Sequence, residues 1–157
     1  MPPALAVMLL AAAAPLFARG SESLWGIAPC ELCMWQRWPY WVAAALALVA
    51  CFSPGPRLRR GLLLAAGVAV LASGAVAVLH VGVEQGWWPS PLPGCQAPRA
   101  AGTSVQDMLS AMPLRPNKPC DAPTYLIPGL PLSMAAMNLI YALALGGFAL
   151  KRATRKG

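Results

Sequence analysis

Residues 29–41 read PCELCMWQRWPYW, and an apolar run without charged residues, 38–56, begins inside this stretch. The run is close to the roughly 20 residues that a helix needs to cross a lipid bilayer. Cys30 and Cys33 stand just before it with two residues between them, a spacing that suits reversible disulfide chemistry because the ring it closes is small. The stretch therefore predicts a pair of thiols at the mouth of a membrane-spanning helix.

The composition of the whole chain also favours a membrane protein. Of its 157 residues, 58% are hydrophobic and only 11% are charged. A soluble domain usually carries about 25% charged residues. Three further segments lack charged residues: 2–18, 61–79 and 122–150. The first has no positive residue before its apolar run, so we expect a retained span rather than a cleaved signal peptide.

We therefore predict an all-α integral membrane protein, a single domain over residues 1–157 with a bundle of four transmembrane helices. The predicted spans lie roughly at 2–18, 36–54, 61–83 and 130–150. The remaining residues form the connections 19–35, 55–60 and 84–129 and the tail 151–157.

The net charge of +7 comes from one connection and the tail. They hold seven positive residues and no negative one: Arg57, Arg59, Arg60, Lys151, Arg152, Arg155 and Lys156. The positive-inside rule makes this side cytoplasmic, so that both termini are inside and 19–35 and 84–129 are extracytoplasmic. All six tryptophans stand on or near these two connections, where indole rings favour the interface. Charge placed in this way orients a membrane protein and does not indicate a nucleic-acid partner.

In this topology four of the five cysteines face the extracytoplasmic compartment, which is oxidising in bacteria. They are Cys30, Cys33, Cys95 and Cys120. Cys51 lies roughly 27 Å along the helix from Cys33 and is expected to be a small packing residue. A CxxC pair also occurs in zinc sites, but a zinc ribbon needs a second close pair, and the other two cysteines are 25 positions apart. We therefore expect no metal site, while purely structural disulfides are an alternative.

The connection between Cys95 and Cys120 contains one organised piece among its prolines. Residues 103–112 read TSVQDMLSAM, with apolar residues at positions i, i+3, i+4 and i+7, which lie on one face of a helix. Thr103 and Gln106 form a capping-box pattern at its start. We expect a short amphipathic helix that lies on the membrane surface or packs on the bundle. It would leave the two cysteines some freedom, so that this outer pair can meet a soluble protein.

Two electrons released by a dithiol need an acceptor. The sequence contains no haem or iron–sulfur motif and no dinucleotide fingerprint, so a lipid-soluble quinone suits the position of the inner pair. Arg37 lies four residues after Cys33, on the same helical face, and can stabilise a thiolate or an anionic cofactor. His80, the only histidine, lies roughly 28 Å along its span, at the extracytoplasmic edge. His80 can bind a quinone or relay its proton, or else pair with Glu84. Glu31, between the two cysteines of the inner pair, would oppose thiolate formation.

Four motifs in this order resemble the DsbB family of membrane disulfide-bond formation proteins, especially its shorter members. They are PCELCMWQRWPY at the start of the second span, HVGVEQGWWP at the end of the third, the cysteine motifs PGCQAP and KPCDAP, and GLPLSMAAMNLIYAL at the start of the fourth. The resemblance covers nearly the whole chain. It implies a four-helix bundle in the bacterial inner membrane that binds ubiquinone or menaquinone and reoxidises a soluble thioredoxin-fold protein of the DsbA type.

The resemblance also implies a role for each site residue. Cys95 would form the mixed disulfide with the DsbA-like partner, and Cys120 would pair with Cys95 at rest. Cys30 and Cys33 would form the quinone-proximal pair, in which Cys33 attacks the quinone or donates charge to it. The family's quinone-contacting positions correspond here to Arg37 and His80.

Two other functions are compatible with the cysteine pattern. A quinone-linked reductase of the vitamin K epoxide reductase type also places a CxxC at a quinone, but late in the chain, whereas here the motif precedes the second predicted span. A non-enzymatic four-span protein would use its cysteines for structural disulfides only. Such a protein would not reduce quinone when it is mixed with quinone and a reduced thioredoxin-fold protein.

Overall fold

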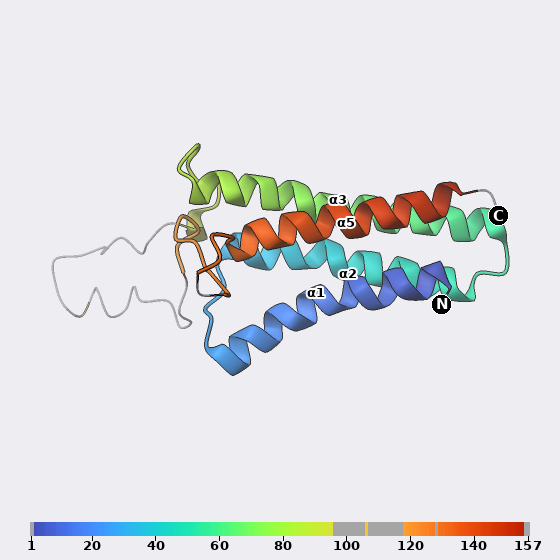
Figure 1. The fold of residues 1–157 in the computed structure, drawn as a ribbon, viewed down its shortest axis with the longest axis horizontal. Helices are drawn as coiled ribbons and strands as arrows, with labels where there is room; N and C mark the ends of the chain where they lie inside the picture. Colours follow the sequence, from blue (N-terminus) through green and yellow to red (C-terminus); the bar gives the residue numbers. More distant parts are fainter. Residues whose placement is uncertain (1, 96–105, 107–117, 128, 156–157) are drawn as a thin grey trace.

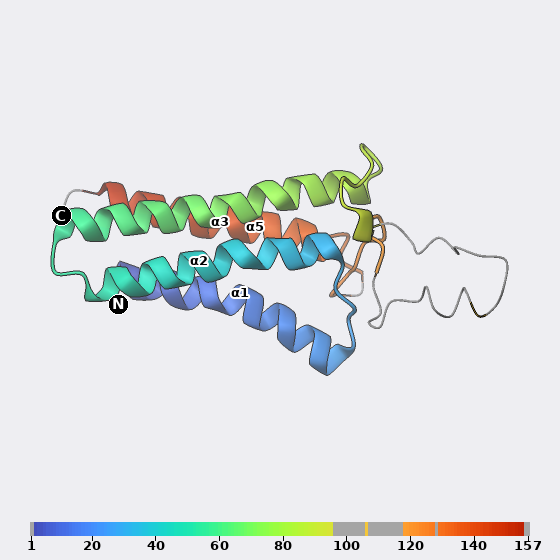
Figure 2. The same ribbon diagram turned by 180° about the vertical axis from the view of Figure 1, so that it is seen from behind.

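The computed structural model describes residues 2–95, 106, 118–127 and 129–155. These residues form four long helices and one short 3-10 helix, in the order α1 (Pro3–Trp25), α2 (Glu31–Phe52), α3 (Pro56–Glu84), η1 (Pro93–Cys95) and α5 (Met134–Thr154). The long helices run along one common axis, and both chain termini lie at the same end of the bundle (Figure 1 and Figure 2). The described residues contain no strand, only an isolated bridge between Tyr125 and Ser133. The prediction of an all-helical fold is confirmed for this part of the chain.

Three of the long helices, α1, α3 and α5, are long and apolar enough to cross a membrane. α2, with 22 residues, is not among these three helices, and its first two turns contain Glu31, Gln36 and Arg37. A membrane crossing by α2, and with it the four-span bundle, therefore stays a prediction. The predicted amphipathic helix at 103–112 lies outside the described residues, apart from Gln106.

The local sequence explains where the helices begin and end. α1 stops at Gly26, whose φ of 64° lies in the left-handed region that glycine enters without strain. α3 begins with Pro56, at a position where the missing N–H costs no hydrogen bond. Cys30 and Ser133 cap α2 and α5, because the sulfur of Cys30 and the hydroxyl of Ser133 each accept a backbone N–H at 3.2 Å. The helix that carries the CxxC motif therefore begins inside the motif itself.

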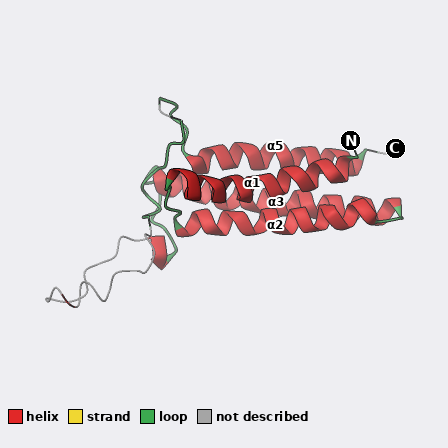
Figure 3. Cartoon of the chain, turned by 90° about the horizontal axis from the view of Figure 1, so that it is seen from below, coloured by secondary structure: helices red, strands yellow, loops and turns green. Residues whose placement is uncertain are grey.

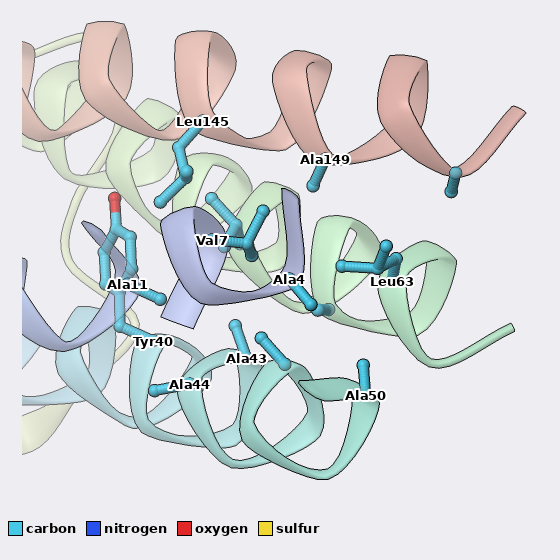
Figure 4. Packing of buried hydrophobic residues seen from close by; sticks show 14 of the residues in the cluster. Ala4, Val7, Ala11, Tyr40, Ala43, Ala44, Ala50, Leu63, Leu145 and Ala149 are labelled. Carbon is cyan, nitrogen blue, oxygen red and sulfur yellow. The ribbon is translucent and has the colours of Figure 1, made fainter. Parts of the chain in front are cut away.

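The core of the bundle consists mainly of small side chains. Figure 4 shows this cluster, to which all four long helices contribute, with Val7 from α1, Ala43 from α2, Leu63 from α3 and Ala149 from α5. Large apolar side chains instead remain exposed on the outside of the helices, including Leu16, Val49, Val68, Ile140 and Leu143. An apolar exterior around a core of small residues is what a bundle in lipid requires.

The helices α3 and α5 approach each other closely because glycines line their contact. A Cβ atom added at Gly74 would lie 3.2 Å from the Cβ of Ala142. A Cβ at Gly146 would lie 2.7 Å from the side chain of Leu71. Any larger side chain at these two positions would push the helices apart.

Helix α1 diverges from the other helices toward its C-terminal end at Trp25 (Figure 1 and Figure 2). Near its middle it is still joined to α5, since the Tyr141 hydroxyl donates to the carbonyl of Leu10 at 2.9 Å. The described connections, apart from the short one between α2 and α3, lie at the end of the bundle opposite the termini, as Figure 3 shows. The cysteine pairs belong to this end.

Candidate functional site

The inner cysteine pair forms a disulfide at the first turn of α2. The Cα atoms of Cys30 and Cys33 are 5.1 Å apart, and Cys30 is 4% exposed. Because Cys30 is the N-cap residue, its sulfur accepts the backbone N–H of Cys33. A helix N-terminus favours negative charge, so this position stabilises a thiolate on Cys30 when the disulfide opens.

The outer pair, Cys95 and Cys120, also forms a disulfide, with its Cα atoms 4.8 Å apart. Cys95 ends η1, and its carbonyl accepts the backbone N–H of Cys120 at 3.1 Å. Both residues are buried, and they share one apolar cluster with Cys30, Leu32 and Val83. Of the three pairings that four cysteines allow, the structure contains 30–33 and 95–120, and it places the two disulfides next to each other.

A cavity of about 390 Å³ lies beside the inner disulfide, between α1, the first turns of α2, the end of α3 and the start of α5. Cys33, Arg37 and His80 all line it, so the three residues predicted to contact a cofactor come together. Its other walls are largely apolar, with Phe17 from α1 and Met137 from α5. The volume falls in the range of small-molecule sites, which are roughly 300–1,000 Å³.

Arg37 brings hydrogen-bond donors into this cavity. Its Nη2 forms an ion pair with Glu22 of α1, and its side chain is only 13% exposed. Its Nε and Nη1 are buried and have no hydrogen-bond partner among the described residues. Since buried donors are nearly always paired, these two N–H groups mark a place where a ligand with acceptor oxygens fits.

His80 contacts both the inner disulfide and a carboxylate. Its Nε2 lies 3.6 Å from the sulfur of Cys30 and 3.8 Å from Oε1 of Glu84, and its Nδ1 lies 3.0 Å from the amide nitrogen of Gln36. The ring is 3% exposed. The sequence left open whether His80 serves the site or pairs with Glu84, and in the structure it contacts both. Glu84 is held in turn by the hydroxyl of Ser133, which donates to its Oε2.

Several polar residues of the site were missed from the sequence. Gln36, Ser73 and Asn138 stand on three different helices and form hydrogen bonds with one another, and Tyr40 donates to Asn138 at 2.8 Å. One signal could have found two of them: Ser73 and Asn138 are polar residues inside apolar segments, where a polar side chain is costly and often functional. Gln36 had no such signal, because it stands next to Arg37, just before the segment without charged residues begins.

Two charged residues complete the surroundings of the cysteines. Lys118 lines the cavity, and its Nζ donates to the carbonyl of Pro123 and to the hydroxyl of Thr124. Glu31 lies against η1, since a side chain at Gly94 would collide with its carboxylate. Oε2 of Glu31 is buried without a hydrogen-bond partner among the described residues. The carboxyl group of Glu31 therefore lies between Cys30, its neighbour in the chain, and η1, which ends at Cys95.

The sulfurs of Cys30 and Cys33 and a ring nitrogen of His80 lie within 4.8 Å of one another, which is close enough for metal ligands. The two sulfurs are joined in a disulfide, whereas cysteine binds a metal as the thiolate. In this oxidised state the three residues therefore form a redox pair with a histidine beside it.

Comparison with known proteins identifies the family. The family model of the disulfide bond formation protein DsbB matches residues 2–151. Neither the curated proteins nor the solved structures contain a significant match to the chain. The matched region includes α1, α2 and α3, most of α5 and both disulfides, which agrees with disulfide chemistry in a membrane protein. The chain therefore belongs to the DsbB family of disulfide bond formation proteins.

Proposed function

We propose that this protein is a quinone-dependent thiol:disulfide oxidoreductase of the bacterial inner membrane. It reoxidises a soluble, thioredoxin-fold periplasmic protein of the DsbA type and passes the electrons through two cysteine pairs to the membrane quinone pool. The observation that carries the proposal is the cavity beside the inner disulfide, where Cys33, His80 and the unpaired donors of Arg37 meet.

The first step is thiol–disulfide exchange at the outer pair. A thiolate of the reduced partner attacks the sulfur of Cys95, so that a mixed disulfide forms and the electron pair of the broken bond remains on Cys120. The second thiolate of the partner then attacks the mixed disulfide and releases the partner oxidised. Cys95 is 3% exposed and Cys120 is 1% exposed, so the partner must displace the residues that cover them.

The second step moves the two electrons to the inner pair. A thiolate of the outer pair attacks the disulfide between Cys30 and Cys33, and a second exchange restores the outer disulfide and leaves the inner pair reduced. Cys30, Cys95 and Cys120 belong to one buried cluster and Cys33 packs against it, which supports an exchange between the two pairs. The N-terminus of α2 stabilises the thiolate that is formed.

The residues around the cavity fit a quinone head group. Nε and Nη1 of Arg37 can donate to a carbonyl oxygen, Cys33 lines the same space, and Phe17 and Met137 form apolar walls. When bound, a quinone supplies an acceptor for two electrons and two protons. Arg37 would hold and orient the head group, and Cys33 would lie beside it in the same cavity.

The proposed topology places these steps at the extracytoplasmic surface. Both termini and the basic connection after α2 lie at one end of the bundle, and the cysteine pairs lie at the other (Figure 1). Six of the seven excess positive residues belong to the described part of the first end: Arg57, Arg59, Arg60, Lys151, Arg152 and Arg155. The positive-inside rule then makes the cysteine end periplasmic, provided that α2 crosses the membrane.

The proposal is tested with purified protein in lipid, a reduced thioredoxin-fold protein and a short-chain ubiquinone or menaquinone analogue. We expect the wild type to reduce quinone and to oxidise the partner in equal amounts. Cys33→Ala should abolish quinone reduction, while Cys51→Ala, which changes the free, exposed cysteine of α2, should retain it. A wild-type protein without quinone reduction would favour the non-enzymatic alternative, and normal turnover in Cys33→Ala would refute the role of Cys33.

The contact with the partner is tested by trapping. A thioredoxin-fold protein with a single active-site cysteine is mixed with Cys120→Ser under mild oxidation, and the complex is digested for mass spectrometry. We expect a disulfide between the partner and Cys95. The control variant Cys95→Ser should form little complex, and a complex through Cys30 instead would contradict the proposed order of transfer.

A further inference from the structure

A chain of polar side chains runs through the bundle and ends at His80. It begins at Tyr40 and continues through Asn138 and Gln36, with Ser73 beside it. We propose that Asn138, anchored by Ser73, sets the orientation of the Gln36 amide and thereby holds His80 in the tautomer whose proton lies on Nε2, facing Cys30. These are positioning residues, and their part in the reaction rests on the function proposed above.

Ser73 can fix the orientation of the Asn138 amide because a hydroxyl group has only one proton to donate. The Ser73 hydroxyl lies 2.7 Å from the backbone carbonyl of Gln36, which can only accept a hydrogen bond, so Ser73 is the donor. Asn138 contacts the same hydroxyl at 3.3 Å, and the only role left to Ser73 there is that of acceptor. Asn138 must therefore turn its NH₂ group toward Ser73. Its carbonyl oxygen then faces the Tyr40 hydroxyl, which donates to it at 2.8 Å.

The same NH₂ group decides the orientation of the next amide. Nδ2 of Asn138 lies 3.0 Å from Gln36 and donates to its Oε1. The two ends of the Gln36 amide differ, so its Nε2 must point the other way, where it lies 3.0 Å from Nδ1 of His80. An amide NH₂ can only donate, and Nδ1 must accept with a lone pair. The proton of the neutral ring is therefore on Nε2.

This proton faces the inner cysteine pair. Nε2 lies 3.6 Å from the sulfur of Cys30 and 3.8 Å from Oε1 of Glu84. Ser73, Gln36 and His80 are 0%, 6% and 3% exposed, and Asn138 is half-buried. In the exchange that restores the outer disulfide, the S–S bond between Cys30 and an outer cysteine breaks, and its electron pair stays on Cys30. The Nε2–H group then donates to this negative sulfur, so His80 acts toward Cys30 as a hydrogen-bond donor and not as a base.

The tautomer can be observed directly because His80 is the only histidine of the chain. The full-length protein is labelled with ¹⁵N-histidine in lipid, and its nitrogen spectrum then reports on one ring. We expect a protonated Nε2 and an unprotonated Nδ1 in the wild type. A wild-type ring with its proton on Nδ1 would overturn the proposal.

Substitution of Asn138 should invert this pattern. The carboxylate in Asn138→Asp offers only acceptors, so Gln36 turns its NH₂ group toward it and presents its oxygen to His80, which moves the ring proton to Nδ1. The control Tyr40→Phe removes a hydrogen bond from the same Asn138 but keeps the Ser73 anchor, and it should retain the wild-type spectrum. Should Asn138→Asp fail to fold, Ser73→Ala removes the anchor and should give a mixture of tautomers. An unchanged nitrogen spectrum in folded Asn138→Asp, or in Ser73→Ala if it is used instead, would refute the proposal that Asn138 sets the tautomer of His80.

A second measurement tests the effect on sulfur. In a background with Cys33→Ser, Cys51→Ala, Cys95→Ser and Cys120→Ser, Cys30 is the only thiol, and iodoacetamide reaches it through the cavity that it lines. We expect Asn138→Asp to slow its alkylation about tenfold, because one hydrogen bond to the thiolate is lost. An inverted tautomer with unchanged alkylation would refute the donor role. Loss of quinone reduction alone, with both of these results as expected, would count only against the proposed function.

Discussion

The guanidinium group of Arg37 has one nitrogen in an ion pair and two that remain available to a ligand. Nη2 is paired with Glu22, while Nε and Nη1 are buried without a partner among the described residues. A buried donor that stays unpaired costs about 1–3 kcal/mol, and a ligand oxygen that accepts from it recovers this free energy. At the residue scale, the affinity of the cavity for a quinone should therefore depend on this guanidinium group.

We expect Arg37→Met to raise the KM for quinone by about tenfold or more, since a hydrogen bond from a charged donor contributes about 1.5–3 kcal/mol. The KM is measured with a short-chain quinone and a saturating concentration of reduced partner protein. Arg19→Met, which removes an exposed arginine of α1, is the matched control and should leave the KM within about twofold. An unchanged KM in Arg37→Met would mean that the quinone binds elsewhere.

At the scale of the elements, the packing of α3 against α5 holds the two halves of the site together. α3 carries His80, and α5 carries Asn138. The distance between the helices is set by glycine and alanine, as at Gly74, where an added Cβ would lie 3.2 Å from the Cβ of Ala142. Small residues therefore contribute to the site although they do not line its cavity.

We expect Gly74→Leu to lower the free energy of unfolding by about 1–3 kcal/mol, because the larger side chain overfills the contact between α3 and α5. Gly147→Leu is the control: it lies on α5, and an added Cβ there meets nothing within 4 Å. Thermal unfolding in detergent, followed by circular dichroism, compares the two variants with the wild type. Equal midpoints for all three proteins would contradict the close packing.

At the scale of the whole molecule, the position of α2 decides the topology. α1, α3 and α5 are apolar enough to cross a membrane, and α2 lies beside them along the same axis (Figure 1). If α2 crosses as well, the connection before it and the connection after it lie on opposite faces of the membrane. The polar first turns of α2 would then lie at the interface, where Arg37 can reach both water and the cavity.

We expect Leu24→Cys and Arg57→Cys to be labelled from opposite sides in a protein without its native cysteines. A membrane-impermeant maleimide applied to intact cells after outer-membrane permeabilisation should label Leu24→Cys, and it should label Arg57→Cys only after the inner membrane is opened. Leu24 is 78% exposed and Arg57 is also exposed, so burial does not limit either reaction. Labelling of both variants in intact cells would show that α2 does not cross.

Much of the arrangement could be predicted because it depends on neighbours along the chain. Cys30, Cys33 and Arg37 fall within two turns of one helix, so their spacing alone brings them to one end of α2. Apolar segment lengths predicted the helices, and the family motifs predicted the pairing of Cys95 with Cys120, which the structure contains. The assignment of roles to these residues stays a prediction until the experiments above are done.

The hydrogen-bonded chain to His80 could not be predicted in this way. Asn138 is 102 residues from Gln36, and Gln36 is 44 residues from His80. Hydropathy shows that a helix is apolar but not how far it is rotated about its axis, and that rotation decides which polar side chain meets which.

The sequence by itself determined an all-helical chain of the DsbB family with two cysteine pairs, since composition, apolar length and motif spacing are properties of the chain alone. Only the tertiary structure decided that the two disulfides share one buried cluster, that a cavity opens beside Cys33, and that the ring of His80 faces Cys30. These features arise where separate helices meet, and the fit of their small side chains sets the distance and rotation between them.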